Sequence, residues 1–166
     1  MSIRRNRLFG DVRDVLVDLL DSKTSASPWN RWEIVSGYPN ETVFEKFLKP
    51  FIFVNSPINK VPLKHQGSSA FNYTLEVAIG AWVNITNGWE NELSIMTSEL
   101  TSLFDNRYTC NTLTFDTETD TEYEDTTLIA MKCPVIDFQI GRLIPYPDDK
   151  QLRQDMSVII KTNLLT

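Results

Sequence analysis

Cysteine and histidine are scarce in this chain of 166 residues, which contains only Cys110, Cys133 and His65. Two cysteines are too few for a disulfide framework, and in a reducing compartment we expect both to be buried thiols. They lack the spacing of metal ligands, and no motif supplies His65 with a partner in the loop-like stretch PLKHQGSSA. We therefore expect no catalytic residues, no bound metal and no cofactor.

Long apolar runs are also missing, because no run approaches the roughly 18 residues that span a bilayer. The first ten residues are basic, but charged residues from Asp11 to Asp18 interrupt the apolar stretch that follows, unlike the core of a secretory signal. Phosphate-loop, dinucleotide-binding and zinc-protease motifs are absent as well. We expect a protein made in the cytoplasm, with no membrane span and no enzymatic activity.

Cations are scarce in the middle of the chain. Eleven Asp and Glu residues accompany a single cation, Arg107, so residues 65–131 carry a net charge of −10. The flanking segments 1–64 and 132–166 carry +3 and +1. A surface of such negative charge repels nucleic-acid phosphate at short range. Four N-terminal arginines suit either a solvated helix start or a contact with phosphate or an acidic protein patch: Arg4, Arg5, Arg7 and Arg13.

Acidic residues alternate with Thr and Tyr in the stretch FDTETDTEYEDTT, residues 115–127. An extended strand would place the carboxylates on one face and the Thr/Tyr row on the other. A solvated loop is the alternative, and blocks of like charge usually adopt it. The stretch lacks the glycine and the ligand order of an EF-hand, so we expect no calcium site. We call the following residues the acidic segment: Asp116, Glu118, Asp120, Glu122, Glu124 and Asp125.

Two stretches have the apolar spacing of amphipathic helices. Apolar residues from Leu8 to Leu20 recur at steps of three and four, which predicts a helix over residues 3–20. The same spacing from Trp89 to Phe104 predicts a helix over residues 88–104. Asn87 and Glu90 have the spacing of a capping box at the start of this second helix.

Four stretches are typical of strands. The stretch KPFIFVNSP is closed by prolines, which suit a sheet edge or strand ends. FNYTLEVAIGAWVN alternates over enough residues to pair with two neighbours, and PVIDFQIGRLIPYPDD contains Gly141, which indicates a bulge. MSVIIKTNLL is the fourth. An additional hairpin that pairs Leu113 with Ala130 and Phe115 with Leu128 would gather one apolar patch from both arms.

The order of these elements predicts the α+β class, with a mostly antiparallel sheet and two main helices packed on it. Loop-like composition separates the elements at DSKTSASPWN and SGYPNE, and there is no internal repeat. Because 166 residues are enough for one continuous core, we expect a single domain over residues 1–166.

Tryptophans provide the candidate interface residues. Trp89 begins the apolar stripe of the second helix, so we expect it in the core. Trp82 lies on the polar face of its strand, and Trp29 and Trp32 lie in a loop-rich segment. If they are exposed, these three aromatic side chains are natural anchors for a protein partner.

The succession of an N-terminal amphipathic helix, the strands KPFIFVNSP and YTLEVAIGAW, the helix GWENELSIMTSELTSLF and late strands ending in MSVIIKT resembles the tail terminator proteins of tailed bacteriophages. In that family a small α/β domain forms a hexameric ring that caps the finished tail tube and joins it to the head connector. The likeness covers most of the chain, although the acidic segment matches no family motif.

The resemblance implies a structural protein of the virion tail or neck, assembled in the host cytoplasm. Its partners would be further copies of itself, the tail-tube protein and the head–tail connector or stopper protein. DNA would pass through the ring without specific binding, and the acidic segment would line the lumen or dock a partner. Two alternatives stay open: another head–tail connector or tail-tube subunit, and a small enzyme that uses carboxylates.

Overall fold

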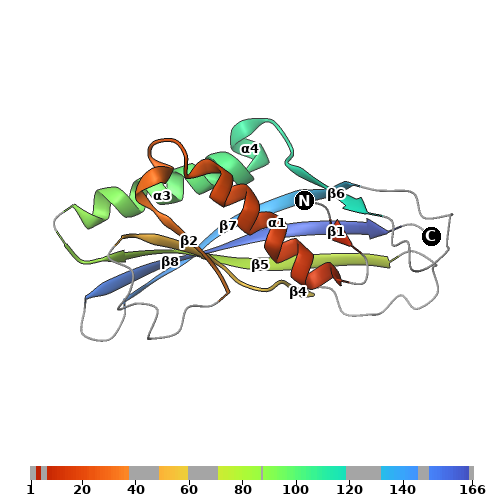
Figure 1. The fold of residues 1–166 in the computed structure, drawn as a ribbon, viewed down its shortest axis with the longest axis horizontal. Helices are drawn as coiled ribbons and strands as arrows, with labels where there is room; N and C mark the ends of the chain where they lie inside the picture. The colour runs from red at the N-terminus through yellow and green to blue at the C-terminus, as the bar shows by residue number, and fades with distance from the viewer. Residues whose placement is uncertain are drawn as a thin grey trace.

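Helices lie on one side of a long twisted sheet in the computed structural model (Figure 1). The structure describes residues 3–4, 7–37, 49–59, 71–86, 88–118, 132–145 and 150–164. The helical segments are α1 (Leu8–Lys23), the 3-10 turn η2 (Trp29–Arg31), α3 (Trp89–Phe104) and α4 (Asn106–Thr109). The strands are β1 (Ile3–Arg4), β2 (Glu33–Ser36), β3 (Phe51–Val54), β4 (Ile58–Asn59), β5 (Phe71–Asn84), β6 (Thr114–Glu118), β7 (Lys132–Pro145) and β8 (Gln151–Leu164).

The apolar stripe of α1 packs into the core, as its spacing predicts, with Val12, Leu16 and Leu20 fully buried. The predicted start at residue 3 is wrong, because Ile3 and Arg4 form β1 and the helix begins at Leu8. The reason is tertiary, since β1 pairs in parallel with β6 and this pairing accompanies the burial of the Ile3 side chain. The apolar spacing of neighbouring residues carries no information about such a pairing.

Helix α3 buries Leu93, Met96, Leu100 and Phe104, and Trp89 packs against the same core as predicted. The predicted capping box is wrong, because the N-cap residue is Gly88, which makes no side-chain cap hydrogen bond. Gly88 has a φ of +87°, a left-handed conformation that glycine adopts without a steric penalty. Asn87 lies outside the described residues.

The described strands form an eight-stranded sheet in the order β1-β6-β7-β8-β5-β3-β2, with β4 also paired to β5. The pairs β1–β6 and β2–β3 are parallel. The pairs of β5 with β3, β4 and β8, and of β7 with β6 and β8, are antiparallel. The α+β class and the predominance of antiparallel pairing are therefore confirmed, although the sheet is mixed.

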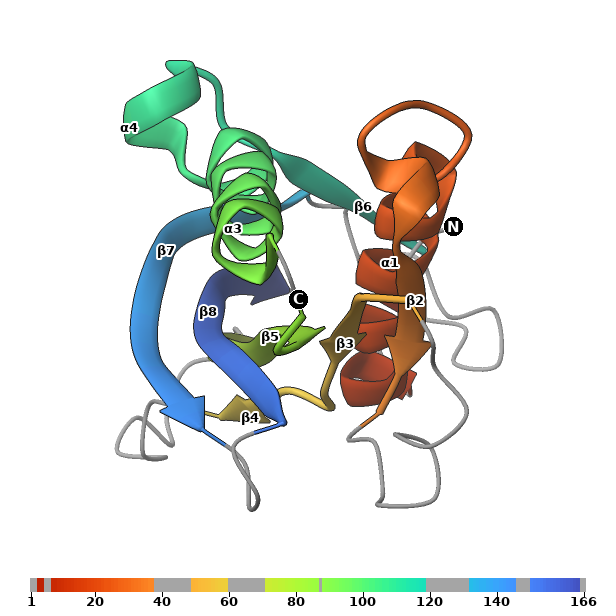
Figure 2. The ribbon, with the colours of Figure 1, turned by 90° about the vertical axis from the view of Figure 1, so that its left-hand side faces the viewer.

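The pairing of β5 with β8 is at the centre of the sheet. It runs without a break from Phe71↔Leu164 to Asn84↔Gln151. Alternate residues of β5, including Leu75, Val77 and Ile79, face the helices and are buried. Figure 2 shows α1 and α3 on the same side of the sheet, with β7 and β8 curving beneath α3. The core lies between this sheet face and the two helices.

The proline-bracketed strand β3 lies inside the sheet between β5 and β2, and all four of its residues are buried. Pro50 and Pro57 flank it, so the prediction that its prolines mark strand ends is confirmed, whereas a place at the sheet edge is wrong. The neighbouring β2 was not predicted from the sequence. Four residues are too few to display a reliable period.

The hairpin of β6 and β7 exists, but its predicted register is wrong. Phe115 pairs with Cys133, and the carbonyl of Leu113 accepts a hydrogen bond from the Val135 amide at 2.8 Å. Because Cys133 and Val135 are both buried, they supply the apolar partners that the sequence analysis assigned to Leu128 and Ala130. Those two residues lie outside the described part of the chain. The bulge predicted at Gly141 is confirmed by a register shift between Ile140 and Leu143.

Replacing Leu100 with Ala should lower the free energy of unfolding by about 2–5 kcal/mol, because it leaves a cavity beneath α3 where the Leu100 side chain is fully buried. Exposed Ser98, on the same helix, is the matched control, and Ser98→Ala should change stability by less than about 0.5 kcal/mol. Urea melts of the two variants measure both values. Equal, small effects would show that α3 does not pack on the sheet in this orientation.

Candidate functional site

The outer side of β7 is covered only at its beginning. Strand β6 pairs with residues 132–134, and beyond Val135 no described strand lies against β7 on the side away from β8. The rest of β7 has no outer neighbour among the described strands because the chain before Leu113 lies outside the sheet and forms helix α4 (Figure 1). We call residues 140–145 of β7 the open edge.

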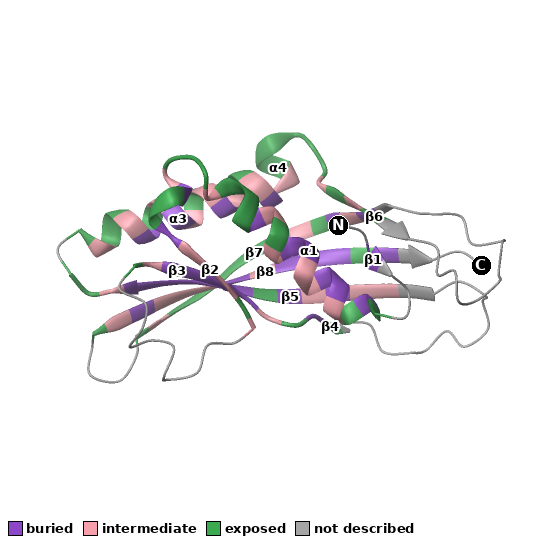
Figure 3. Cartoon of the chain, in the orientation of Figure 1, coloured by how far each residue is buried: buried purple, intermediate pink, exposed green. Residues whose placement is uncertain are grey.

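Apolar side chains accompany this edge. Ile140 is 54% exposed and Leu143 is 48% exposed, although both are large and apolar. Tyr108 of α4 is 70% exposed. Most of α4 is coloured as exposed in Figure 3, and α4 contacts β7. Groups of exposed apolar residues on one surface commonly mark a site of protein–protein contact.

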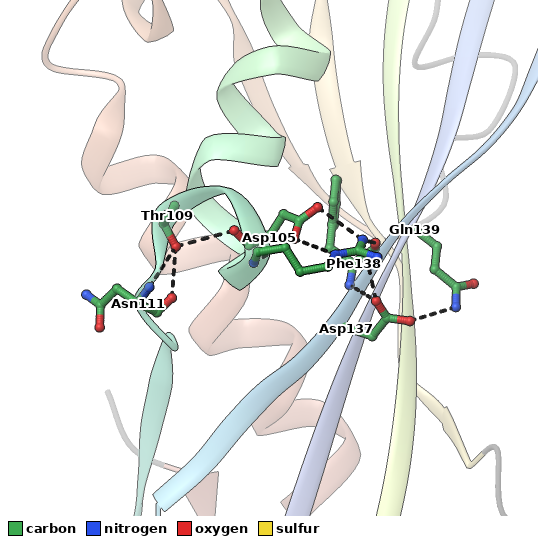
Figure 4. A network of polar contacts seen from close by, with 7 residues as sticks. Asp105, Thr109, Asn111, Asp137, Phe138 and Gln139 are labelled. Carbon is green, nitrogen blue, oxygen red and sulfur yellow. Dashed lines mark hydrogen bonds and ion pairs between the residues drawn. The ribbon is translucent and has the colours of Figure 1, made fainter.

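Arg107 of α4 contacts β7 just before the open edge begins, at Phe138 and Asp137, which are labelled in Figure 4. Its Nη2 atom donates a hydrogen bond to the Phe138 carbonyl at 3.2 Å and lies 3.8 Å from Asp137 Oδ1. The Phe138 amide in turn donates to Asp137 Oδ1 at 2.9 Å. Both main-chain groups of Phe138 on the outer side of the strand are therefore satisfied within the chain.

Asp105 holds Arg107 in this position. The carboxylate accepts hydrogen bonds from Arg107 Nε at 3.0 Å and Nη2 at 3.1 Å, and it caps α4 by accepting from the Arg107 amide at 3.0 Å. The side-chain hydrogen bond from Arg107 holds the pKa of Asp105 below its ordinary value, and Asp105 raises the pKa of Arg107. The only cation of residues 65–131 thus has defined partners, although its place in the sequence did not indicate them.

A turn after α4 completes the polar network of Figure 4. Thr109 Oγ1 accepts a hydrogen bond from the Asn111 amide at 3.2 Å and donates to the Asn111 carbonyl at 2.9 Å. On the β7 side, Gln139 Nε2 donates to Asp137 Oδ2 at 2.9 Å. Within this network, the contacts of Arg107 with Phe138 and Asp137 join α4 to β7.

A groove of about 440 Å³ runs between α3 and the open edge. Ile140 and Gln154 lie on the sheet side and Tyr108 lies on α4. Gln154 also donates a hydrogen bond to the Gly141 carbonyl at 3.0 Å, which holds the bulge in place. The α3 side of the groove is lined mainly by hydroxyl groups, which belong to Ser94, Thr97, Ser98 and Thr101.

The acidic segment begins as a strand. Asp116 and Glu118 lie in β6, in register with Lys132 of β7 and Arg4 of β1 respectively, so the extended conformation is confirmed for residues 114–118. Phe115 packs against the core and Asp116 is exposed, which is the alternation that the sequence predicts. The remaining members, Asp120, Glu122, Glu124 and Asp125, lie outside the described residues.

Two of the four N-terminal arginines, Arg7 and Arg13, have acidic partners on α1. Arg7 Nε lies 3.9 Å from the buried carboxylate of Asp11, and Arg13 Nη2 lies 3.0 Å from Asp14 Oδ1. These contacts favour the interpretation of a helix start over that of a phosphate site.

Trp29 and Trp32 are not exposed anchors, which corrects the expectation for the loop that contains them. Both side chains are buried and pack edge to face with ring centroids 5.1 Å apart. The Trp29 indole N–H donates to Glu99 Oε2 at 2.9 Å, and that of Trp32 donates to Glu92 Oε1. The η2 segment therefore folds back onto α3, and both tryptophans belong to the core.

Trp82 is also buried, on the sheet face opposite the helices. Its position on the polar face of β5 was predicted correctly, but Phe51 stacks on it at a centroid distance of 5.3 Å and Phe53 packs at 6.0 Å. The guanidinium carbon of Arg153 lies 5.6 Å from the Trp82 ring. Gly80 makes room for Phe53, since a Cβ atom there would lie 2.0 Å from the Phe53 ring. An exposed anchor at Trp82 is therefore excluded.

The two cysteines differ from each other. Cys133 is buried as expected, and burial raises the pKa of its thiol to about 11, so it stays protonated at neutral pH. Cys110 is exposed at the end of α4, which corrects the expectation of a buried thiol. Within the described residues no three His, Cys, Asp or Glu side chains lie close enough to share a metal ion. His65 lies outside those residues.

Comparison with models of known protein families and with curated protein sequences finds no match for this chain. None of the described helices is both long and apolar enough to cross a membrane.

The Asp105 carboxyl should titrate below its ordinary pKa of 3.8, because Arg107 stabilises the carboxylate. The stabilisation of the folded state by this pair is therefore complete above that pH and is lost as the pH falls through the lower folded-state pKa. NMR titration of the carboxyl carbon should show the midpoint rising toward 3.8 in Arg107→Met. In the control Glu90→Gln the midpoint should not move, and an unchanged midpoint in Arg107→Met would contradict the pairing.

Proposed function

We propose that this chain is a structural protein of a bacteriophage virion, located in the tail or neck, that caps the tail tube as a hexameric ring. In this role it terminates tail growth and joins the tail to the head connector. The observation that carries the proposal is the open edge of β7 with the exposed side chains of Ile140, Leu143 and Tyr108. An apolar sheet edge in a chain that works alone is a liability for aggregation, whereas a ring subunit needs such a surface.

A second support is the sequence resemblance to tail terminators, with which the α+β architecture agrees. The described site contains a groove and a polar network but no convergent set of catalytic or metal-binding side chains. A carboxylate-dependent enzyme would need its acids to converge in one pocket. Asp116 lies exposed on β6, and the groove next to α3 contains one acid, Glu90.

The acidic segment has a role in this proposal. Residues 65–131, which contain the acidic segment, carry a charge of −10, so six copies would bring a charge of −60 to the ring. Carboxylates within a Debye length of about 8 Å from passing DNA would keep it off the wall of the lumen. Exposed Asp116 on the outward-facing parity of β6 is consistent with such a surface.

Native mass spectrometry and negative-stain imaging of the purified protein, with and without tail tubes, should detect closed rings of six copies that bind the tube end. A monomer in dilute solution would not contradict the proposal, because assembly depends on protein concentration. Monomers at every concentration, together with no binding to tubes, would contradict the proposal. Open-ended stacks would identify a tail-tube subunit instead.

Neutralising five of the six carboxylates of the acidic segment should impair passage of DNA while leaving the ring intact. Changing Asp116, Glu118, Asp120, Glu122 and Glu124 to Asn or Gln removes like-charge repulsion, so folding and assembly should persist. Rings of this variant should retain DNA at low salt and release it as salt rises. Virions assembled with this variant should have heads joined to tails but should eject DNA poorly.

Neutralising exposed acids on the helices, Asp18, Asp21 and Glu90, provides the control and should change neither DNA retention nor ejection. A segment variant that fails to join tails would indicate a docking surface for the tube or the connector. Normal infectivity with unchanged DNA retention would exclude a role in the lumen.

A further inference from the structure

The open edge of β7 presents main-chain groups that pair with no strand among the described residues. Arg107 and Asp137 engage the outer carbonyl and amide of Phe138, which shows that this residue directs its main chain away from β8. Successive residues of a strand direct their main-chain groups to opposite sides. Ile140, two residues after Phe138, therefore also presents its N–H and C=O outward.

Strand β2 forms a second edge at the other end of the sheet order, where no described strand pairs with it on the side away from β3. The amides of Glu33 and Gly37 donate to the carbonyls of Pro50 and Val54, at 3.0 and 2.8 Å, and so point toward β3. By the same alternation, Ile34 and Ser36 direct their main-chain groups outward. The chain thus carries two different edges, each with main-chain groups that point outward.

These two edges lie at the same level of the sheet. Residues 140–145 of β7 pair with residues 152–156 of β8, which in turn pair with residues 79–83 of β5. That part of β5 pairs with β3, and β3 pairs with β2. A neighbouring copy therefore needs no shift along the strand direction to bring its β2 beside the open edge.

The strand directions are also compatible. Strands β7 and β5 run one way, and β8 and β3 run the other, because each neighbouring pair from β7 to β3 is antiparallel. Strand β2 is parallel to β3, so it runs opposite to β7. A second copy placed sideways with its helices on the same face would present β2 antiparallel to the open edge.

We propose that β2 of one copy pairs in antiparallel fashion with the open edge of β7 in the next copy, so that the sheet continues from subunit to subunit. This inference rests on the proposed ring, and it names the contact that builds it. Because the two edges differ, the contact is head-to-tail, which is the kind that closes into a ring. Main-chain hydrogen bonds would supply affinity, as they do when a strand is added to a sheet edge.

Side chains on both edges fit this contact. Exposed Arg142 on β7 and partly exposed Glu33 on β2 bear opposite charges, and Glu33 also lies 3.7 Å from Lys49 of its own chain. In each subunit α1 packs over β2, so the neighbour's α1 would be brought toward the groove between α3 and the open edge (Figure 2). Ile140, Leu143 and Tyr108 would then be covered by the neighbouring subunit.

Single proline substitutions test the two edges separately. Ser36→Pro and Ile140→Pro each remove one outward N–H, without removing a hydrogen bond to β3 or β8. The matched controls Ser36→Ala and Ile140→Val keep the N–H, and Ile140→Val also keeps a branched apolar side chain at the contact. Both proline variants should remain folded monomers by circular dichroism and native mass spectrometry under conditions in which the wild type and these two controls form rings.

Mixing the two proline variants tests the head-to-tail arrangement. Ser36→Pro retains an intact β7 edge and Ile140→Pro retains an intact β2 edge, so an equimolar mixture should form a one-to-one dimer and no ring. In that dimer, the Ile140 amide of the Ser36→Pro subunit should become protected from hydrogen exchange. A symmetric contact between two β7 edges would instead let Ser36→Pro dimerise alone, and this result would overturn the proposal.

Rings that form from both proline variants would overturn the edge contact but leave the ring and the proposed function standing. A wild-type protein that forms no ring, alone or on tail tubes, would remove the proposed function and this inference with it. The two failures are therefore distinguished by the behaviour of the wild type.

Discussion

The continuous pairing of β5 with β8 is the interaction on which the rest of the structure depends. These strands share an unbroken register over the full length of β5, and every other layer is attached to them. Strands β3 and β4 pair with the far side of β5, and β7 pairs with the far side of β8. Helices α1 and α3 then cover the apolar face that these strands create. Side-chain alternation in β5 sets which face becomes the core.

The same arrangement leaves the sheet incomplete on both flanks. Strand β6 is short, and the chain leaves the sheet at α4, so β7 continues beyond its outer neighbour. Arg107, which Asp105 holds in place, bonds the carbonyl of Phe138, and Asp137 accepts from its amide, so Ile140 is the next residue whose main chain points outward. The opposite flank ends at the four residues of β2. Edges that differ in this way suit an assembly in which each copy contacts the next by the same pair of surfaces.

Much of the candidate site was not predictable from the sequence. The bulge at Gly141 and the unusual isolation of Arg107 were visible in it, but nothing local indicated that Arg107 reaches the Phe138 carbonyl. The exposure of Trp29 and Trp32 was predicted wrongly for a related reason. A polar neighbourhood in the sequence predicts exposure, yet Trp29 and Trp32 place their indole N–H groups on Glu99 and Glu92 and bury their rings. Burial of an amphipathic side chain depends on a partner for its polar atom, and that partner is distant in sequence.

The sequence by itself determined the helices α1 and α3, the strands β3, β5, β7 and β8, and the α+β class. Apolar residues recur with a period of 3.6 in a helix and 2 in a strand, and this spacing can be seen in residues close together in the chain. It also determined which face of β5 is apolar. Only the tertiary structure decided the register of β6 on β7, the existence of β1 and β2, the burial of Trp82 and the extent of the open edge. Each of these depends on hydrogen bonds or ring contacts between residues far apart in the chain, and such pairings leave no periodic signal within either partner.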